Sequence, residues 1–207
     1  MIVSNKFLWM HIGKAAGTTT GSMFYIIKGI LDSNIDMNEK GFLKHDNITR
    51  RTTNYETKSI YTREHLNSLD KILNIRRLPE YIMSNTQHGI KHNNRVFNKE
   101  SMINGFVNHS STKNLNGHVD TILSSYIEEK EPTHWLRTEN INEDFVDMIK
   151  NYYDIDEKLE TRLLKVRVNV NKDYNKNINE FFTEDEIKEM YKNCPLWCEY
   201  EEKIYGR

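Results

Sequence analysis

The sequence predicts an α/β fold of three layers, in which a mainly parallel central sheet is flanked by helices. Short apolar runs of strand length alternate with longer segments whose apolar residues recur at helical spacing. The first apolar run also leads into a glycine-containing loop and then a helix, an order typical of phosphate-binding α/β proteins. The sequence contains no repeat, low-complexity tract or obvious linker, so we expect a single domain over residues 1–207.

The composition is that of a packed globule without a strong charge bias. Hydrophobic residues make up 37% of the chain and charged residues 29%, with 11 Tyr, 8 Phe and 3 Trp. The formal net charge of −1 provides no global field for nucleic acid or an anionic membrane, although a local basic site for a small anion remains possible. No run approaches the about 20 apolar residues of a membrane span, and the N-terminus does not resemble a signal peptide. We therefore expect a soluble, cytoplasmic protein.

The first half of the chain contains the clearest strand and helix signals. Residues 6–12 (KFLWMHI) predict a buried strand, and apolar residues at helical spacing from Met23 to Leu31 predict the next helix. Residues 32–57 are polar and are expected to be mostly loop. A short strand is expected at 58–61 and a better one at 71–75. Because proline favours the first turn of a helix, we expect a helix over 79–88, followed by a turn-like segment over 88–98.

The second half contains further helices and one strand. We expect a helix over 116–129, a short strand over 133–136, and a helix capped by Asn142 with two acidic residues in its first turn. Residues 183–186 (TEDE) form a capping-box pattern. Cys194 and Cys198 are spaced C-x3-C without a second pair, so a structural zinc site is not expected and both are interpreted as free thiols.

The strongest functional signal is the loop HIGKAAGTTT at residues 11–20. Gly17, Thr18 and Thr19 fall where a helix should begin, and the unbonded N–H groups and positive dipole end there favour an anion. The ammonium group of Lys14 can reach the same anion from the strand exit. The order strand, glycine loop, helix predicts a P-loop-like fold, but the lysine precedes the second glycine by three residues. This spacing departs from the Walker A pattern and argues against an NTPase.

This loop resembles the 5′-phosphosulfate loop of the carbohydrate sulfotransferases, whose pattern is His-Ile-Pro-Lys-x-x-Gly-Thr-Ser/Thr. Gly13 stands where the family usually has proline, which should loosen the loop without removing a ligand. The resemblance implies that 3′-phosphoadenosine 5′-phosphosulfate (PAPS) donates a sulfuryl group to a hydroxyl or amine, with a glycan as the expected acceptor. It also implies that the 5′ end of this nucleotide is bound by Lys14, Ala16, Gly17, Thr18 and Thr19.

A second motif of the same family binds the 3′-phosphate through an arginine at a strand end and a serine eight residues later. The segment NIRRLPEYIMS supplies Arg76 and Ser84 at that spacing, with Arg77 as the alternative if the register slips by one. Arginine offers a planar fork of donors that suits phosphate. Residues 133–145 (THWLRTENINEDF) are similar to a later family segment, which implies that Arg137 and Thr138 face the cofactor. Residues 197–205 (WCEYEEKIY) are similar to the closing helix of the family.

Sulfuryl transfer also needs a base for the acceptor hydroxyl. Lys14 suits the leaving oxygen, and the segment FLKHDNIT resembles a family Lys-His pair, which makes His45 the candidate base. The other candidates are His88, His92, His109 and His118, whereas His11 is expected to orient the loop. The donor carries its own activated leaving group, so no metal is required.

Three other functions remain open. A P-loop kinase-like phosphotransferase would require ATP and Mg²⁺, and the misplaced lysine argues against it. A non-catalytic relative would bind adenosine 3′,5′-bisphosphate without turnover. A plain interaction domain would leave both predicted anion sites unexplained.

Overall fold

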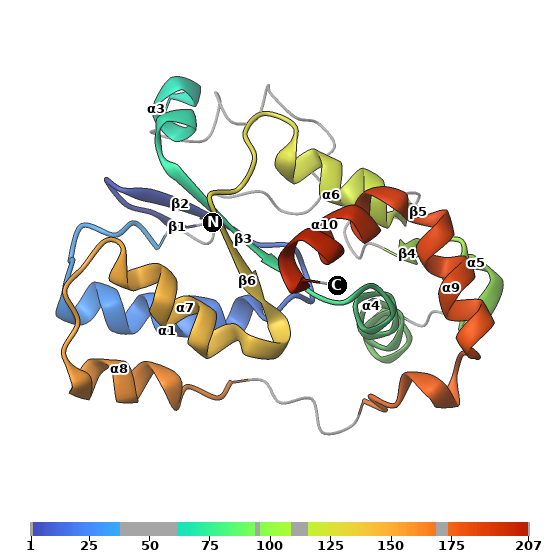
Figure 1. Ribbon diagram of the computed structural model, residues 1–207. Coiled ribbons are helices and arrows are strands. Elements are labelled where there is room, and N and C mark those ends of the chain that lie inside the picture. Colours follow the sequence, from blue (N-terminus) through green and yellow to red (C-terminus); the bar gives the residue numbers. More distant parts are fainter. Residues whose placement is uncertain (1, 38–61, 94–95, 109–115, 169–173, 207) are drawn as a thin grey trace. The chain divides into compact units, whose positions relative to one another are not determined.

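The computed structural model describes residues 2–37, 62–93, 96–108, 116–168 and 174–206 (Figure 1). It is a mixed α/β structure with a mostly parallel central sheet flanked by helices, as the sequence predicts. The described residues form two compact units. Unit 1 comprises residues 2–37, 62–75 and 129–168, and unit 2 comprises 76–93, 96–108, 116–128 and 174–206. No helix in these ranges is long and apolar enough to cross a membrane.

Unit 1 contains the central sheet. Its strands follow the spatial order β1 (Ile2–Val3), β2 (Phe7–Met10), β3 (Asp70–Ile75) and β6 (His134–Arg137). Strand β1 is antiparallel to β2, whereas β2, β3 and β6 are parallel. Met10 pairs with Leu73, and Ile75 pairs with Arg137. Because parallel strands end at the same edge of a sheet, the loop after β2 and the residues after β6 both start from that edge.

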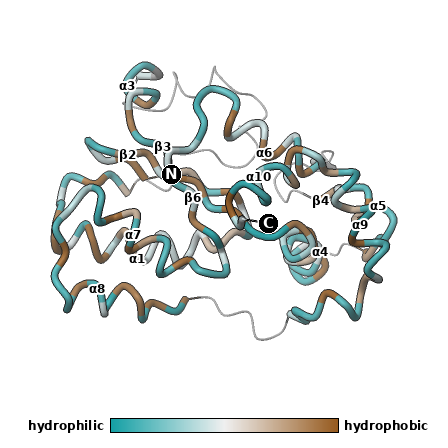
Figure 2. The backbone as a smooth tube through the Cα atoms, in the orientation of Figure 1, coloured by the Kyte–Doolittle hydropathy of each residue, from teal (hydrophilic) through white to brown (hydrophobic). Residues whose placement is uncertain are grey.

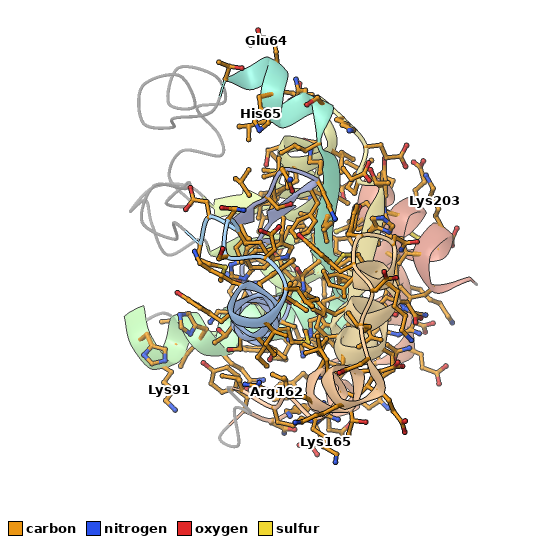
Figure 3. The ribbon with its side chains drawn as sticks, turned by 90° about the vertical axis from the view of Figure 1, so that its left-hand side faces the viewer. Glu64, His65, Lys91, Arg162, Lys165 and Lys203 are labelled. Carbon is orange, nitrogen blue, oxygen red and sulfur yellow. The ribbon has the colours of Figure 1, made fainter. Side chains whose placement is uncertain are left out.

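The helices of unit 1 are α1 (Gly17–Ile30), α3 (Arg63–Ser68), α7 (Ile141–Lys150) and α8 (Glu157–Leu164), with a 3₁₀ turn at Thr138–Asn140. Phe24 joins the core by lying 5.4 Å from the ring of Phe7 on β2 and 4.8 Å from that of Phe145 on α7. Hydrophobic and hydrophilic segments alternate along α7 and α8, as expected of helices with one buried face (Figure 2). The exposed side chains of Glu64 and Lys165 extend away from the ribbon (Figure 3).

The predicted cap at Asn142 is wrong. Helix α7 begins at Ile141, and Asn142 lies inside it with only 1% of its surface exposed. Its Nδ2 donates to the carbonyl oxygens of Leu163 and Val166, at 2.7 and 3.1 Å. The last carbonyls of a helix have no hydrogen-bond partner within the helix. The buried amide of Asn142 supplies donors to the carbonyls at the end of α8 instead of capping the start of α7.

Unit 2 consists mainly of helices, and its two-stranded sheet pairs β4 with β5 in antiparallel orientation. Its elements are α4 (Leu78–Asn93), α5 (Lys99–Ile103), β4 (Phe106–Asn108), β5 (Asn116–His118), α6 (Val119–Ile127), a 3₁₀ turn (Ile178–Glu180), α9 (Glu184–Asn193) and α10 (Pro195–Tyr205). The capping box is confirmed, because Thr183 and Glu186 exchange both side-chain-to-backbone bonds. Cys194 is buried and Cys198 is partly buried, and neither forms a disulfide within the described residues.

Two predicted boundaries in unit 2 need correction. Helix α4 continues through Asn93, so the segment expected to be turn-like from 88 onward is helical over its first six residues. The helix expected from 116 begins at Val119, after strand β5, and the imidazole of His118 caps it by accepting the N–H of Asp120. The polar residues from 88 onward therefore do not end α4. The strand expected at 58–61, and the expected loop from residue 38 onward, lie outside the described residues.

Candidate functional site

The loop between β2 and α1 has a strained backbone. Lys14 and Ala16 have positive φ angles of 69° and 57°, in the left-handed region that side chains other than glycine rarely adopt. Ala16 is also the N-cap of α1, and its methyl group cannot accept a hydrogen bond from the helix. The first turn of α1 contains no acidic residue. This helix start therefore keeps the positive character that attracts an anion.

At the start of α1, the imidazole of His11 occupies the space beside Gly17. A Cβ atom at this position would lie 1.9 Å from Nε2 of His11. The imidazole is held by stacking on the indole of Trp9, with ring centroids 5.6 Å apart and planes 16° apart. His11 thus braces the helix start against the end of β2, which fits the orienting role expected from the sequence.

Lys14 is half-buried, and this burial lowers the pKa of its ammonium group from 10.5 to about 8. Removal from water disfavours the charged form of an amine. An anion bound beside the ammonium would favour the charged form again and raise its pKa. Lys14 therefore has the electrostatics of a group prepared for a negative ligand.

The three threonines of the loop lie in different environments. Thr18 is exposed, whereas the hydroxyl of Thr19 donates to the carbonyl oxygen of Val168 at 3.2 Å. Thr20 is fully buried and donates to the carbonyl oxygen of Ala16 at 3.2 Å. Thr18 and Thr19 lie in the first turn of α1, as predicted, and their contact with a nucleotide stays a prediction.

A buried polar chain that the sequence reasoning missed connects this loop to the sheet. Nε1 of Trp9 donates to Oδ1 of Asn74 at 2.5 Å, and Nδ2 of Asn74 donates to the hydroxyl of Thr20 at 2.9 Å. Thr20 in turn bonds to Ala16 at the strained turn. Asn74 is fully buried next to the last residue of β3. The available signal was an amide within the apolar run ILNI at residues 72–75, because buried amides require partners.

Arg137 ends β6 and is held by Asp144 on α7. Its Nε and Nη2 donate to the two carboxylate oxygens at 2.9 and 2.6 Å, and its backbone N–H adds a third bond at 2.7 Å. Asp144 is 9% exposed, so this bidentate ion pair is largely shielded from water. The hydroxyl of Thr138 donates to the carbonyl oxygen of Ile75 at 3.0 Å. The expected contact of Arg137 with a cofactor stays a prediction, but its side chain already has a structural partner.

The second predicted motif belongs to unit 2. Arg76 accepts a hydrogen bond on its carbonyl oxygen from Nε1 of Trp197 at 3.1 Å. Ser84 lies half-buried on α4, about 9 Å along the axis from the first helical residue at the usual rise of ~1.5 Å per residue. Arg77, the alternative to Arg76, forms an ion pair with the buried carboxylate of Glu201 at 3.5 Å.

The histidine candidates for a base differ in their surroundings. His45 and His109 lie outside the described residues. His88 lies 3.3 Å from the hydroxyl of Tyr174 and 4.5 Å, between ring centroids, from His92. His118 is engaged as the cap of α6, which favours a structural role for it. The assignment of His45 as the base stays a prediction. Among the residues that the structure describes, no cluster of three or more His, Cys, Asp or Glu could hold a metal ion.

Comparisons of the chain with protein-family models, curated proteins and solved structures found no match. The function must therefore be inferred from the residues and geometry described above.

Proposed function

We propose that this protein is a PAPS-dependent sulfotransferase with a P-loop-like, three-layer α/β fold. The observation that supports this most strongly is the loop after β2, where Lys14 adopts a strained conformation before an uncapped, acid-free helix start. Backbone strain in a non-glycine residue is found mainly where function requires it. A lysine whose pKa burial lowers to about 8 at the same place suits the 5′-phosphosulfate.

In the proposed reaction, the bond between sulfur and the bridging oxygen of the donor breaks as the acceptor oxygen bonds to sulfur. The bridging oxygen leaves with the 5′-phosphate, and the proton of the acceptor hydroxyl passes to a base, for which His45 is the candidate. Lys14 and the backbone N–H groups from Gly17 onward would stabilise the negative charge that develops on the leaving oxygen. Holding donor and acceptor in line supplies the remaining acceleration.

In this proposal Arg76 and Ser84 would bind the 3′-phosphate of the nucleotide, and the loop after β2 would bind its 5′ end. The acceptor we propose is a glycan hydroxyl or amine. A 3′-phosphate distinguishes this donor from ATP, so preference for it is the property to test first.

The test is a thermal-shift panel with adenosine 3′,5′-bisphosphate, adenosine 5′-monophosphate (AMP) and ATP with Mg²⁺. We expect the bisphosphate to stabilise the protein most. A second assay then measures the transfer of labelled sulfate from PAPS to members of a glycan library, and we expect transfer to at least one of them. Stabilisation by ATP with Mg²⁺ alone would favour the kinase-like alternative. Binding of the bisphosphate without transfer to any acceptor would favour a non-catalytic relative, and binding of neither nucleotide would contradict the proposal.

A further inference from the structure

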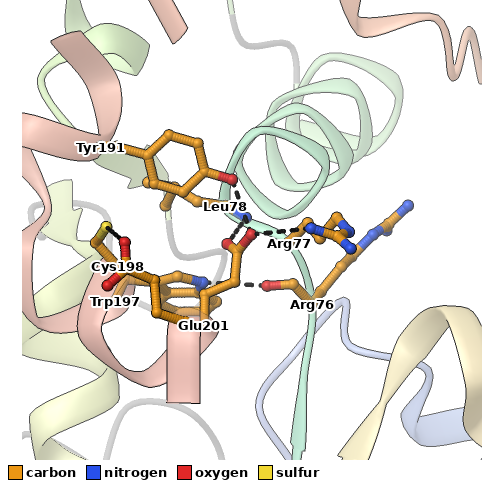
Figure 4. A network of polar contacts seen from close by, with 8 residues as sticks. Arg76, Arg77, Leu78, Tyr191, Trp197, Cys198 and Glu201 are labelled. Carbon is orange, nitrogen blue, oxygen red and sulfur yellow. Dashed lines mark hydrogen bonds and ion pairs between the residues drawn. The ribbon is translucent and has the colours of Figure 1, made fainter. Parts of the chain in front are cut away.

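Glu201 on α10 is a carboxylate with none of its surface exposed. Its Oε2 accepts the backbone N–H of Leu78 at 2.8 Å, and its Oε1 accepts the hydroxyl of Tyr191 at 2.8 Å. The ion pair with Nη1 of Arg77, at 3.5 Å, completes the arrangement (Figure 4). A buried carboxylate is strongly unfavourable without such partners, so Arg77 contributes to keeping Glu201 charged in this place.

Arg77 is engaged a second time by an aromatic ring. Its guanidinium carbon lies 4.4 Å from the ring centroid of Tyr205, the last residue of α10. Stacking of this kind suits the flat guanidinium group. Arg77 thus contacts α10 through both a carboxylate and a ring, and its charge is already balanced within unit 2.

The start of α4 differs from an anion-binding helix start. The N–H of Leu78 is used by Glu201, and Pro79 has no N–H to offer. The negative charge of Glu201 at this place also opposes a second anion. A phosphate near this helix must therefore be recognised mainly by side chains rather than by backbone donors.

Trp197 fixes the residue that precedes Arg77. Its Nε1 donates to the carbonyl oxygen of Arg76, and its fully buried indole stacks on Tyr81 at 4.3 Å between ring centroids. Helix α10 therefore holds both the carbonyl of Arg76 and the N–H of Leu78. In Figure 4 the side chain of Arg77 turns toward Glu201, whereas that of Arg76 points away from it.

We propose, on the basis of the proposed function, that Trp197 and Glu201 are positioning residues that present Arg76, and not Arg77, to the 3′-phosphate. They act by fixing the backbone on both sides of Arg77, at the carbonyl of Arg76 and at the N–H of Leu78. The two adjacent arginines thereby acquire different roles that their sequence alone does not distinguish.

The experiment is isothermal titration of the full chain with adenosine 3′,5′-bisphosphate and with AMP. The ratio of the two affinities measures the preference for a 3′-phosphate. Arg76→Ala is expected to abolish this preference. Arg77→Ala should lower the melting temperature and leave the preference intact. Trp197→Phe keeps the stacked ring but removes the N–H, and should reduce the preference about fivefold, the value of one typical hydrogen bond.

Two further comparisons separate positioning from a general structural defect. Trp197→Phe should have no additional effect on the preference in the Arg76→Ala background, whereas a general defect would weaken AMP and the bisphosphate equally. Glu201→Gln keeps an oxygen for the N–H of Leu78 and should retain the preference, whereas Glu201→Leu should reduce it about fivefold.

Loss of the preference in Arg77→Ala, or an unchanged preference in both Trp197→Phe and Glu201→Leu, would overturn the inference. Either result leaves the proposed function standing. Failure of the proposed function would instead appear in the unmodified protein, as equal affinity for the two nucleotides or no binding of either.

Discussion

The two segments proposed to bind the nucleotide each lie where a strand gives way to a helix, but they are stabilised differently. Before α1, the loop is held by neutral hydrogen bonds through Asn74 and Thr20, and the first turn of the helix contains no acidic residue. Before α4, the buried carboxylate of Glu201 takes the N–H of Leu78. The difference teaches that a helix start becomes an anion site only if its surroundings leave its donors available.

The two segments also differ in the charges that they offer. Lys14 has its pKa lowered to about 8, so its charge changes within an accessible pH range. Arginine keeps its charge at any pH that a folded protein experiences. We therefore expect binding at the 5′ end to depend on pH between about pH 7 and 10, and binding at the 3′ end to change little over that range.

The largest effect is expected from Lys14→Ala. It removes the positive charge that would stabilise the negative charge developing on the leaving oxygen, so the rate of sulfate transfer should fall about a hundredfold or more. Folding should survive, because the substitution also relieves the burial of an ammonium group. The measurements are the rate of labelled sulfate transfer and the melting temperature. Lys165→Ala, which alters an exposed lysine of unit 1, is the control and should leave transfer unchanged. Equal rates in the two variants would remove Lys14 from the site.

Gly17→Ala should have the second-largest effect, because its Cβ would collide with the imidazole of His11. Displacing either group should cost about 1–3 kcal/mol of stability, typical of overpacking, and should weaken AMP binding at least tenfold. Chemical denaturation and isothermal titration measure the two effects.

Gly29→Ala, in the same helix, is the matched control, because nothing lies within 4 Å of a Cβ there. It should be neutral or stabilise the protein by about 0.5–1 kcal/mol. Similar losses in both glycine variants would show that the close approach of His11 does not matter.

The sequence predicts the two segments unequally well. The order of strand, loop and helix around Lys14 follows from local signals: an apolar run, a glycine and helical spacing. The central strand at 71–75 and the capping box at Thr183 are equally local, and both are confirmed. Such features are recoverable because each depends on residues a few positions apart.

The missed features all depend on contacts that form only when separate elements pack together. Glu201 is one of several acids in WCEYEEKIY, and only the approach of α10 to the start of α4 selects it for burial. The same holds for Asn142, whose local pattern indicates a cap but whose amide binds the end of α8. Arg137 resembles a cofactor ligand in sequence, yet Asp144 lies within its reach once α7 folds back on β6. Tertiary contacts thus override local preference where polar groups are buried.

The third prediction concerns pH. Because the Lys14 pKa is lowered to about 8, the ammonium is charged below that pH and loses its proton above it. AMP affinity should therefore be highest between about pH 7 and 8, where the phosphate is also dianionic, and should fall up to about tenfold per unit above pH 8. Adenosine 3′-monophosphate, which lacks the 5′-phosphate, should bind equally well across pH 7–10. Isothermal titration over this range tests both ligands.

Lys71 must be controlled for in this experiment, because burial also lowers its pKa to about 8. It lies near the start of β3, at the edge of the sheet opposite the loop, so Lys71→Met should leave the pH profile of AMP binding unchanged. Lys14→Met should remove the decline above pH 8. A decline that persists in Lys14→Met would assign the pH dependence to another group.

The smallest effect is expected from Thr20→Val, which keeps the side-chain shape but removes the hydroxyl between Asn74 and Ala16. The amide of Asn74 would lose a buried partner, so the free energy of unfolding should fall by about 1–3 kcal/mol. AMP affinity should fall only about threefold, because the substitution removes a hydrogen bond that supports the helix start and does not remove a group that contacts the nucleotide. The 3′-phosphate preference should not change. Thr20→Ser retains the hydroxyl and should restore both values. If Thr20→Val reduced the 3′-phosphate preference as well, the two segments would be energetically coupled. The neutral hydrogen bonds before α1 and the buried carboxylate before α4 would then not act independently.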